Sequence, residues 1–236
     1  MRHTRNSVRG LAIAAGAALG AGALAVTTLT GTATADQPAT ATAAIASTDG
    51  TNGAGTNGAT EAAAIPADAF LTGDELPEHP DGWYSEGPVD GLPEVPVFCY
   101  DALLPEENVA HVTHWTELDT NAVQVVMDLG SEGAAAGLVE VLNEASTDCA
   151  SEWLWQHPGG TASWDDFGGV EGADYARVIG VHTAPPESAH DVNLSAVIRE
   201  GSLVTVVRWG QMGTLSQAPV TEFLATAEAA LARLEG

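Results

Sequence analysis

The chain has 236 residues, of which 32 are Asp or Glu and seven are basic, for a formal charge of −25. All seven basic residues are arginine, so chemistry that needs a lysine, such as Schiff-base formation, is excluded. A chain this acidic repels phosphate backbones and anionic lipid surfaces. We therefore expect no nucleic-acid partner and no membrane partner for the mature protein.

The first 35 residues have the pattern of an export signal. Three arginines lie within the first nine residues, an apolar stretch follows over 11–26, and Ala33-Thr34-Ala35 offers a small-x-small cleavage site. The sequence predicts a cleaved signal peptide over 1–35, with a retained membrane anchor as the alternative. The apolar stretch is short and glycine-rich for a spanning helix. We expect a secreted protein, extracellular or associated with the cell wall.

Residues 36–64 consist mainly of Ala, Thr, Gly, Ser and Asn. This segment lacks the apolar residues needed to build a core, so the sequence predicts a disordered linker. Composition changes at Ile65, and the remainder is long enough for a single core. The expected organisation is a signal peptide (1–35), a linker (36–64) and one domain (65–236).

In the first half of the domain, the pattern predicts a short helix near Pro66, an edge strand over Val95–Tyr100 and a β-hairpin made of His111–Leu118 and Ala122–Leu129. A helix is predicted from its N-cap at Ser131 to Cys149. Its expected buried stripe comprises Leu138, Val141, Leu142 and Ala145.

The second half predicts an acidic loop over Trp164–Asp174, a three-stranded antiparallel meander and a closing helix over Pro219–Leu234. The strands of the meander are Tyr175–Thr183, Val192–Arg199 and Leu203–Trp209. The last strand is apolar on both faces, which is typical of a covered central strand. The predicted fold class is α+β, a twisted antiparallel sheet with two helices packed on one face and one disulfide.

Cys99 and Cys149 are the only two cysteines. Export exposes them to an oxidising compartment, where an isolated cysteine pair usually forms a disulfide. The sequence predicts this bond between the strand at 95–100 and the far end of the first helix. Two buried free thiols are the alternative.

The order of elements resembles a known family. The segment IPADAFLTGDELPE is followed by a strand with Cys99, a hairpin, a helix ending at Cys149, three strands and a C-terminal helix. This arrangement, over about Ile65–Gly236, is similar to the extracellular sensor domain of PknH-type mycobacterial receptor kinases and its secreted actinobacterial relatives. The resemblance implies an antiparallel sheet, two helices and a cleft for an unidentified extracellular ligand. It also implies two disulfides, of which this chain can form one.

No catalytic or metal-binding motif stands out. His111 and His114 fall on opposite faces of a strand, so we expect surface histidines and no zinc site. The acidic loop residues do not follow the spacing of a calcium loop, so a solvated loop is favoured over a cation site. No Gly-x-Ser-x-Gly elbow is present. We expect no cofactor, no metal and no enzymatic activity. The acidic residues of that loop are Asp165, Asp166, Glu171 and Asp174.

The candidate binding residues are the arginines and aromatic side chains of the C-terminal half. Structural ion pairs are the default role for these arginines, and the sharper hypothesis is a cleft that holds an anionic or sugar-like ligand. The predicted function is a monomeric, sensor-like binding domain for an unidentified extracellular molecule or envelope component. The alternatives are a protein-interaction module of the cell envelope and a hydrolase of unrecognised type. The candidates are Tyr175, Arg177, Arg199, Arg208, Trp209, Trp153 and Trp155.

Overall fold

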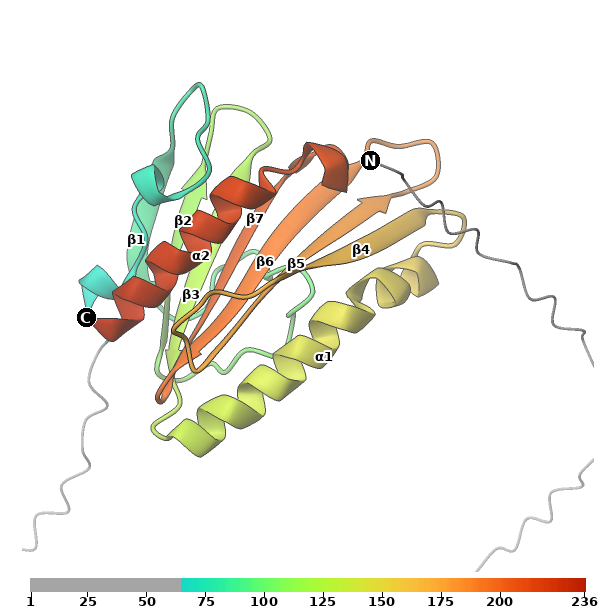
Figure 1. The fold of residues 1–236 in the computed structure, drawn as a ribbon. Coiled ribbons are helices and arrows are strands. Elements are labelled where there is room, and N and C mark those ends of the chain that lie inside the picture. Colours follow the sequence, from blue (N-terminus) through green and yellow to red (C-terminus); the bar gives the residue numbers. More distant parts are fainter. Residues whose placement is uncertain (1–64) are drawn as a thin grey trace, which may run out of the picture. The chain divides into compact units, whose positions relative to one another are not determined.

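A computed structural model describes residues 65–236, shown in Figure 1; the expected signal peptide and linker lie outside the described residues. The strands are β1 (Tyr84–Asp90), β2 (Val109–Trp115), β3 (Asn121–Asp128), β4 (Thr161–Gly168), β5 (Tyr175–Ala184), β6 (Asp191–Glu200) and β7 (Leu203–Met212). The helices are α1 (Glu132–Gln156) and α2 (Val220–Glu235), with short 3-10 turns at Ala67–Ala69, Gly73–Glu75 and Leu215–Gln217. Within 65–236, no helix is both long enough and apolar enough to cross a bilayer.

The seven strands form one antiparallel sheet in the order β1-β2-β3-β7-β6-β5-β4. The predicted hairpin is β2–β3 and the predicted meander is β5–β6–β7, so both are confirmed. β7 lies beside β3, which places the last strand of the chain in the middle of the sheet. The mixed α+β class with an antiparallel sheet and one disulfide is therefore the observed one.

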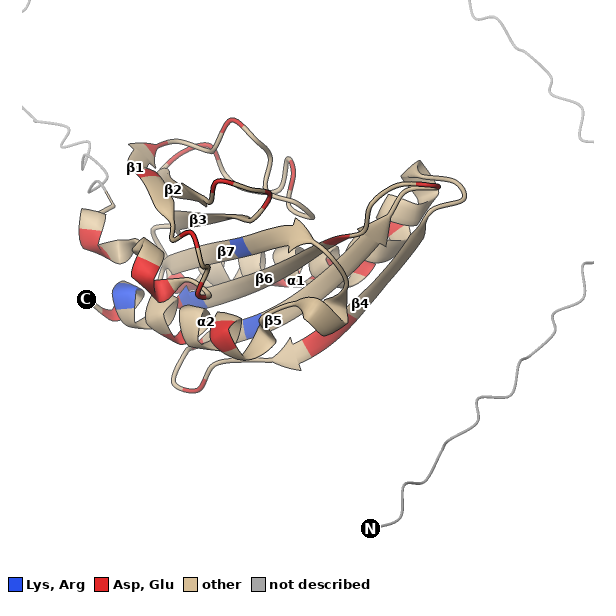
Figure 2. Ribbon diagram, turned by 90° about the horizontal axis from the view of Figure 1, so that it is seen from above, with Lys and Arg blue, Asp and Glu red and all other residues tan. Residues whose placement is uncertain are grey.

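The two helices cover opposite faces of the sheet, and the expectation that both lie on one face is wrong. On β7, Val204 and Val206 pack in the cluster that contains residues of α1, whereas Val207 and Trp209 pack with residues of α2. Figure 2 shows the strands running between α2 and α1. Because β7 is apolar on both faces, each face of the sheet must be shielded from water, and one helix packs on each. We call the two sides the α1 face and the α2 face.

α1 is longer than predicted. It begins where expected, because the Ser131 Oγ accepts a hydrogen bond from the Ala134 amide at 3.2 Å, but it continues past Cys149 to Gln156. The buried stripe is also rotated from the predicted one. Val139 is buried, whereas Val141 is 47% exposed. The helix turns the small residues of its sequence toward the sheet, among them Ala135, Ser146 and Ala150.

The segment between β1 and β2 is not a strand, contrary to the prediction for Val95–Tyr100. Its backbone turns at Cys99, where φ is 72°, a value that no extended strand adopts. Val97 and Tyr100 are buried all the same, because this segment packs over the α1 face. The predicted loop at Trp164–Asp174 is likewise wrong over its first five residues, which belong to the edge strand β4.

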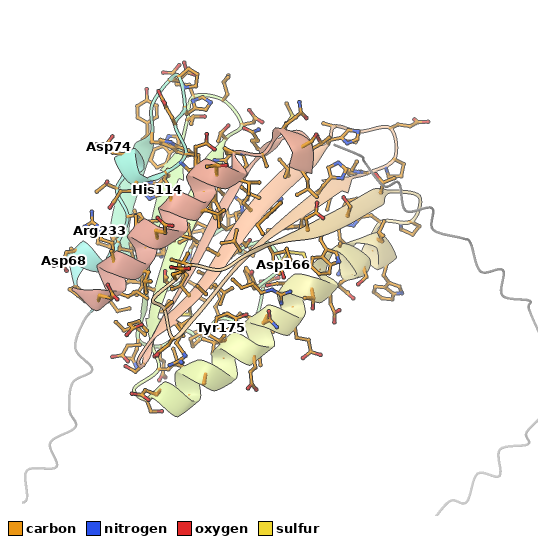
Figure 3. The ribbon with its side chains drawn as sticks, viewed as in Figure 1. Asp68, Asp74, His114, Asp166, Tyr175 and Arg233 are labelled. Carbon is orange, nitrogen blue, oxygen red and sulfur yellow. A yellow bond between two sulfur atoms is a disulfide. The ribbon has the colours of Figure 1, made fainter. Side chains whose placement is uncertain are left out.

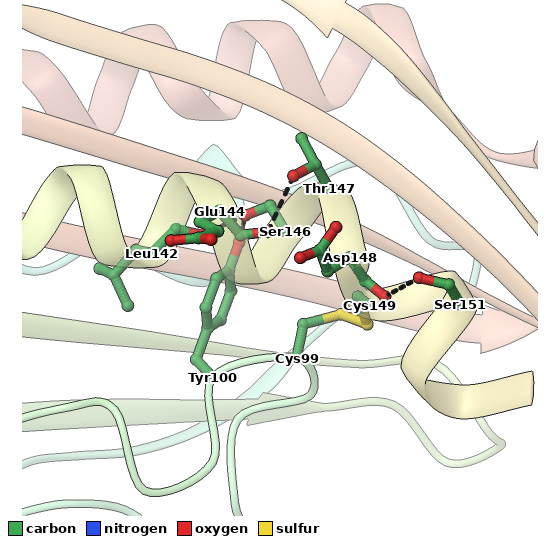
Figure 4. The surroundings of a disulfide bond; sticks show 9 residues. All are labelled: Cys99, Tyr100, Leu142, Glu144, Ser146, Thr147, Asp148, Cys149 and Ser151. Atoms are coloured by element: carbon green, nitrogen blue, oxygen red, sulfur yellow. Dashed lines mark hydrogen bonds between the residues drawn. A yellow bond between two sulfur atoms is a disulfide. The ribbon is translucent and has the colours of Figure 1, made fainter. Parts of the chain in front are cut away.

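The predicted disulfide between Cys99 and Cys149 is present, and it joins this irregular segment to the middle of α1 (Figure 4). Beside it, the Tyr100 and Ser146 hydroxyls lie 2.8 Å apart, and the Ser146 Oγ donates to the Leu142 carbonyl at 2.7 Å. The bond and the buried Tyr100 hydroxyl thus fix the position of residues 97–104 over the sheet.

The start of the domain is fixed to the α2 face by a buried side chain on β3. The Gln124 Oε1 accepts from the Leu71 amide at 2.7 Å, and its Nε2 donates to the Ala69 carbonyl at 3.2 Å. Phe70 and Leu71 of this segment are buried. Arg233 on α2 forms an ion pair with Glu75 at 2.9 Å, which ties the same segment to the C-terminal helix.

Candidate functional site

A cavity of about 860 Å³ opens on the α1 face, at the end of the sheet formed by β1, β2, β3 and β7. We call it the main cavity. The central strands form its floor, and β1 together with the segment 92–96 forms its wall. The residues that matter below are Glu86, Asp90, Glu94, His111, Trp115 and Arg208. Its size lies within the range of small-molecule binding pockets.

Arg208 lies on β7 between Val123 of β3 and Ser195 of β6. Strand alternation places its side chain on the α1 face, two residues after Val206. The guanidinium lies against Gly210, where an added Cβ would stand 3.3 Å from Cζ and Nη1. Its Nη1 donates a hydrogen bond to the Asn121 Oδ1. The absence of a side chain at residue 210 therefore makes room for the guanidinium along the strand.

Arg208 differs from the other arginines of residues 65–236 in having no carboxylate partner within that range. Its Nε is buried and has no hydrogen-bond acceptor among the described residues. Burial lowers the pKa of Arg208 to about 10, so the side chain still carries its charge at neutral pH. The three paired arginines are Arg177 with Asp166, Arg199 with Asp174 and Arg233 with Glu75, each at 2.9 Å.

A smaller cavity of about 260 Å³ shares Asn121 and Arg208 with the main cavity. It also includes Trp153 of α1 and Asn193 of β6. We call it the side cavity. Arg208 therefore lines both cavities, and a bound molecule in either one would meet its guanidinium.

Two further side chains shape the main cavity. Trp115 is 40% exposed and stacks on Tyr84 of the neighbouring edge strand, with ring centroids 6.2 Å apart. The His111 Nδ1 lies 2.8 Å from the Gly91 carbonyl oxygen. Because a carbonyl only accepts, Nδ1 carries the hydrogen and Nε2 is left as an acceptor in the neutral ring. Trp115 thus offers a flat aromatic wall, and His111 is held in a fixed orientation.

A serine–histidine pair lies on the opposite, α2 face. The Ser85 Oγ is 2.7 Å from the His114 Nδ1, and the two residues are directly paired between β1 and β2. His114 is 2% exposed, which corrects the expectation that it is a surface histidine. Burial lowers the pKa of His114 to about 4, and its Nε2 has no hydrogen-bond partner among the described residues. The Ser85–His114 distance is that of a nucleophile and its general base, but no carboxylate of the described residues accepts a hydrogen bond from the other ring nitrogen.

The structure does not bring the seven predicted binding residues into one cavity. Tyr175 and Arg177 both donate to the Asn143 Oδ1 on α1, and Arg177 also pairs with Asp166. Tyr175 and Asp166 are labelled in Figure 3. Hydrogen bonds from the Gly168 amide and from Arg177 hold the pKa of Asp166 below its usual value.

The remaining predicted residues are also dispersed. Arg199 pairs with Asp174, Trp209 is buried in the core on the α2 face, and Trp155 is 78% exposed near the end of α1. Only Arg208 and Trp153 line a common cavity, the side cavity.

Metal ligation finds no support in residues 65–236, which contain no group of three or more His, Cys, Asp or Glu placed to hold an ion. His111 and His114 lie on opposite faces of β2, as their spacing predicts. The acidic residues expected in a loop are divided between β4 and the turn that follows it, where Asp166 and Asp174 are used in ion pairs with arginines.

Several cavity residues were missed by the sequence reasoning. Glu86, Asp90 and Glu94 belong to the turn-rich stretch before β2, which has no periodicity to show which side chains face a cavity. Asn121 lies between the two strands of the predicted hairpin, and nothing in the sequence indicated that its side chain would line a cavity. Trp115, an aromatic residue within the predicted strand His111–Leu118, was the one available indication, and the structure leaves it 40% exposed.

The chain was also compared with known proteins. No model of a known protein family matches it, and the search of curated proteins found none with significant similarity.

Proposed function

We propose that the chain is a secreted, non-enzymatic, sensor-like binding domain that takes up a small extracellular molecule through an anionic group held by Arg208. The resemblance to the extracellular sensor domains of PknH-type kinases forms part of this proposal, and so does export. The observation that supports it is the arginine without a carboxylate partner between two cavities, in a chain with 32 acidic residues.

The chemistry of a half-buried guanidinium explains why it would bind an anion. Arginine has five N–H donors, and only one hydrogen bond, to Asn121, connects this group with other described residues. Leaving the rest without acceptors costs free energy, which a bound carboxylate offsets by accepting two parallel bonds. A carboxylate about 4 Å away gains about 4 kcal/mol at an effective dielectric constant of 20, before its own desolvation.

The experiment is a thermal-shift screen of the full chain against small carboxylates, sugar acids and cell-wall fragments. A ligand that binds only the folded state raises the melting temperature, by the equivalent of about 2.7 kcal/mol at 100 times its Kd. We expect hits that carry an anionic group, and we expect Arg208→Gln to weaken each hit at least tenfold, since one charged hydrogen bond contributes more than about 1.4 kcal/mol.

Arg233→Gln is the matched control, because it removes an arginine from the opposite face, where it pairs with Glu75. We expect it to lower the melting temperature of the free protein and to leave the ligand-induced rise unchanged. Hits that bind Arg208→Gln as tightly as the wild type would contradict the proposal.

A hydrolase is the second candidate, and the contact between Ser85 and His114 favours it. Against it stands the pKa of about 4, which makes His114 a weak base at neutral pH. Hydrolysis of 4-nitrophenyl acetate by the wild type but not by Ser85→Ala would establish this candidate. Equal background rates for both proteins would dismiss it. The envelope-interaction module stays a prediction.

A further inference from the structure

The charges of the main cavity specify more than an anionic ligand. Its lining holds one cation, Arg208, and two carboxylates, Glu86 and Glu94. Asp90 also borders the cavity, but it pairs with Ala110, which packs on the α2 face, so its side chain is directed away from the cavity. Glu86 and Glu94 are exposed, and neither forms an ion pair with another described residue. The cavity therefore carries a negative net charge around a single positive group.

A simple anion satisfies only one part of this arrangement. It gains the attraction of Arg208 but meets two like charges on the wall, in the field of a chain with formal charge −25. A polyanion, such as a diphosphate, is repelled more strongly with each added charge. A plain cation finds the wall attractive but leaves the charge of Arg208, which has no carboxylate partner among residues 65–236, without an anion.

A molecule that carries both charges satisfies both parts of the cavity. Its carboxylate accepts from Arg208 on the floor, while an ammonium group meets Glu86 or Glu94 on the wall. Trp115 adds an aromatic face, which attracts an ammonium group within about 6 Å of the ring. The volume of about 860 Å³ leaves room for a chain between the two charges.

We propose, resting on the function proposed above, that the ligand is a zwitterion of the amino-acid or short-peptide type, with a free carboxylate at Arg208 and an ammonium group at the acidic wall of the main cavity. The orientation follows from the charges: the carboxylate lies inward against β7 and the ammonium outward against β1 and residues 92–96.

The test uses three matched probes and the full chain. The probes are the dipeptide lysyl-alanine, its C-terminal amide, which lacks the carboxylate, and its diacetyl derivative, which lacks both ammonium groups. Binding is measured by calorimetric titration to the wild type, to Arg208→Gln and to the double variant Glu86→Gln, Glu94→Gln. Circular dichroism confirms that each variant is folded, which we expect because the three side chains form no ion pairs with described residues.

We expect the dipeptide to bind the wild type at least tenfold more tightly than either truncated probe. Removing the ligand carboxylate should cost nothing further in Arg208→Gln, and removing the ammonium groups should cost nothing further in the double variant. This pattern assigns each ligand charge to its protein partner.

Two outcomes overturn the inference. If the diacetyl probe binds the wild type as tightly as the dipeptide, the site is a plain anion site, and the proposed function stands without the zwitterion. If none of the three probes binds, the zwitterion assignment is wrong, and the carboxylate screen with Arg208→Gln decides separately whether the proposed function holds.

Discussion

Gln124 makes three hydrogen bonds in the middle of the sheet while being fully buried. Two of them satisfy the backbone of residues 69 and 71, and the third reaches the Thr205 Oγ1 at 3.2 Å. A buried amide of this kind stabilises the fold because the backbone groups it serves have no water to replace it. It decides where the first residues of the domain attach.

Replacing Gln124 by Leu keeps the volume but leaves the Leu71 amide and the Ala69 carbonyl without partners. We expect a loss of roughly 2–6 kcal/mol in the free energy of unfolding, from about 1–3 kcal/mol for each of the two buried polar groups left unpaired. Urea denaturation followed by circular dichroism measures this. Thr205→Val, which removes one of the Gln124 partners and also its own bond to Val125, is the milder comparison. An unchanged midpoint for Gln124→Leu would contradict this account.

His114 makes stability depend on pH. Its pKa is lowered from 6.5 to about 4 by burial, so the folded protein binds fewer protons than the unfolded chain between these values. Its contribution is therefore complete above pH 6.5 and is lost as the pH falls toward 4. We expect the wild type to be roughly 2.5 kcal/mol less stable at pH 4.5 than at pH 7 through this group alone.

His114→Gln should remove that part of the pH dependence, because glutamine does not titrate. The measurement is the difference between the free energies of unfolding of the two proteins at each pH between 7 and 4.5, because carboxylates that protonate in this range do so in both proteins. Parallel curves for the two proteins would show that His114 does not titrate as its burial requires.

At the scale of the elements, the disulfide holds the irregular segment between β1 and β2 over the α1 face. It closes a loop of 50 residues, which in the chain-entropy model stabilises the folded state by about 4 kcal/mol. We expect the double variant Cys99→Ser, Cys149→Ser to lose most of this in urea denaturation under oxidising conditions. Under reducing conditions the wild type should approach the variant. A variant as stable as the oxidised wild type would contradict the claim that the disulfide stabilises the fold.

The sequence predicted the elements whose residues alternate or repeat with a clear period. The strands β5, β6 and β7 and the helix α2 were found this way, because their buried residues follow one another at regular spacing. The extension of α1 to Gln156 was missed although Trp153 lies four residues after Cys149, at helical spacing, because three consecutive apolar residues, Trp153 to Trp155, hide the period there. The apolar run at Val95–Tyr100 gave a false strand, since burial alone does not distinguish a packed irregular segment from a strand.

The candidate site was predicted less well than the fold, for a physical reason. A cavity wall made of a turn-rich segment has no periodicity, so Glu86, Asp90 and Glu94 could not be assigned to it. Arg208 was among the predicted residues, but the sequence could not separate it from the three arginines that have carboxylate partners. Whether an arginine has a carboxylate partner depends on which acidic side chains the fold places beside it, and the sequence does not show this.

At the scale of the whole molecule, the sheet is covered on both faces, by α2 on one and by α1 with the 91–108 segment on the other. The apolar residues on both faces of β7 already indicated that each face of the sheet is covered. This pattern is stronger evidence for the helix placement than the assumption that both helices pack on one face. This arrangement leaves the β1–β2–β3 end of the α1 face without a helix, and there the main cavity opens.

The account depends on Arg208 being a charged group with donors available to an external anion. The most direct measurement is the NMR signal of each arginine Nε–H during addition of sodium propionate, with sodium chloride at equal ionic strength as the reference. We predict a saturable shift of the Arg208 signal, identified by its absence in Arg208→Gln, while the signals of the three ion-paired arginines stay in place. An Arg208 signal that does not move, or that moves no more than the others, would contradict the claim.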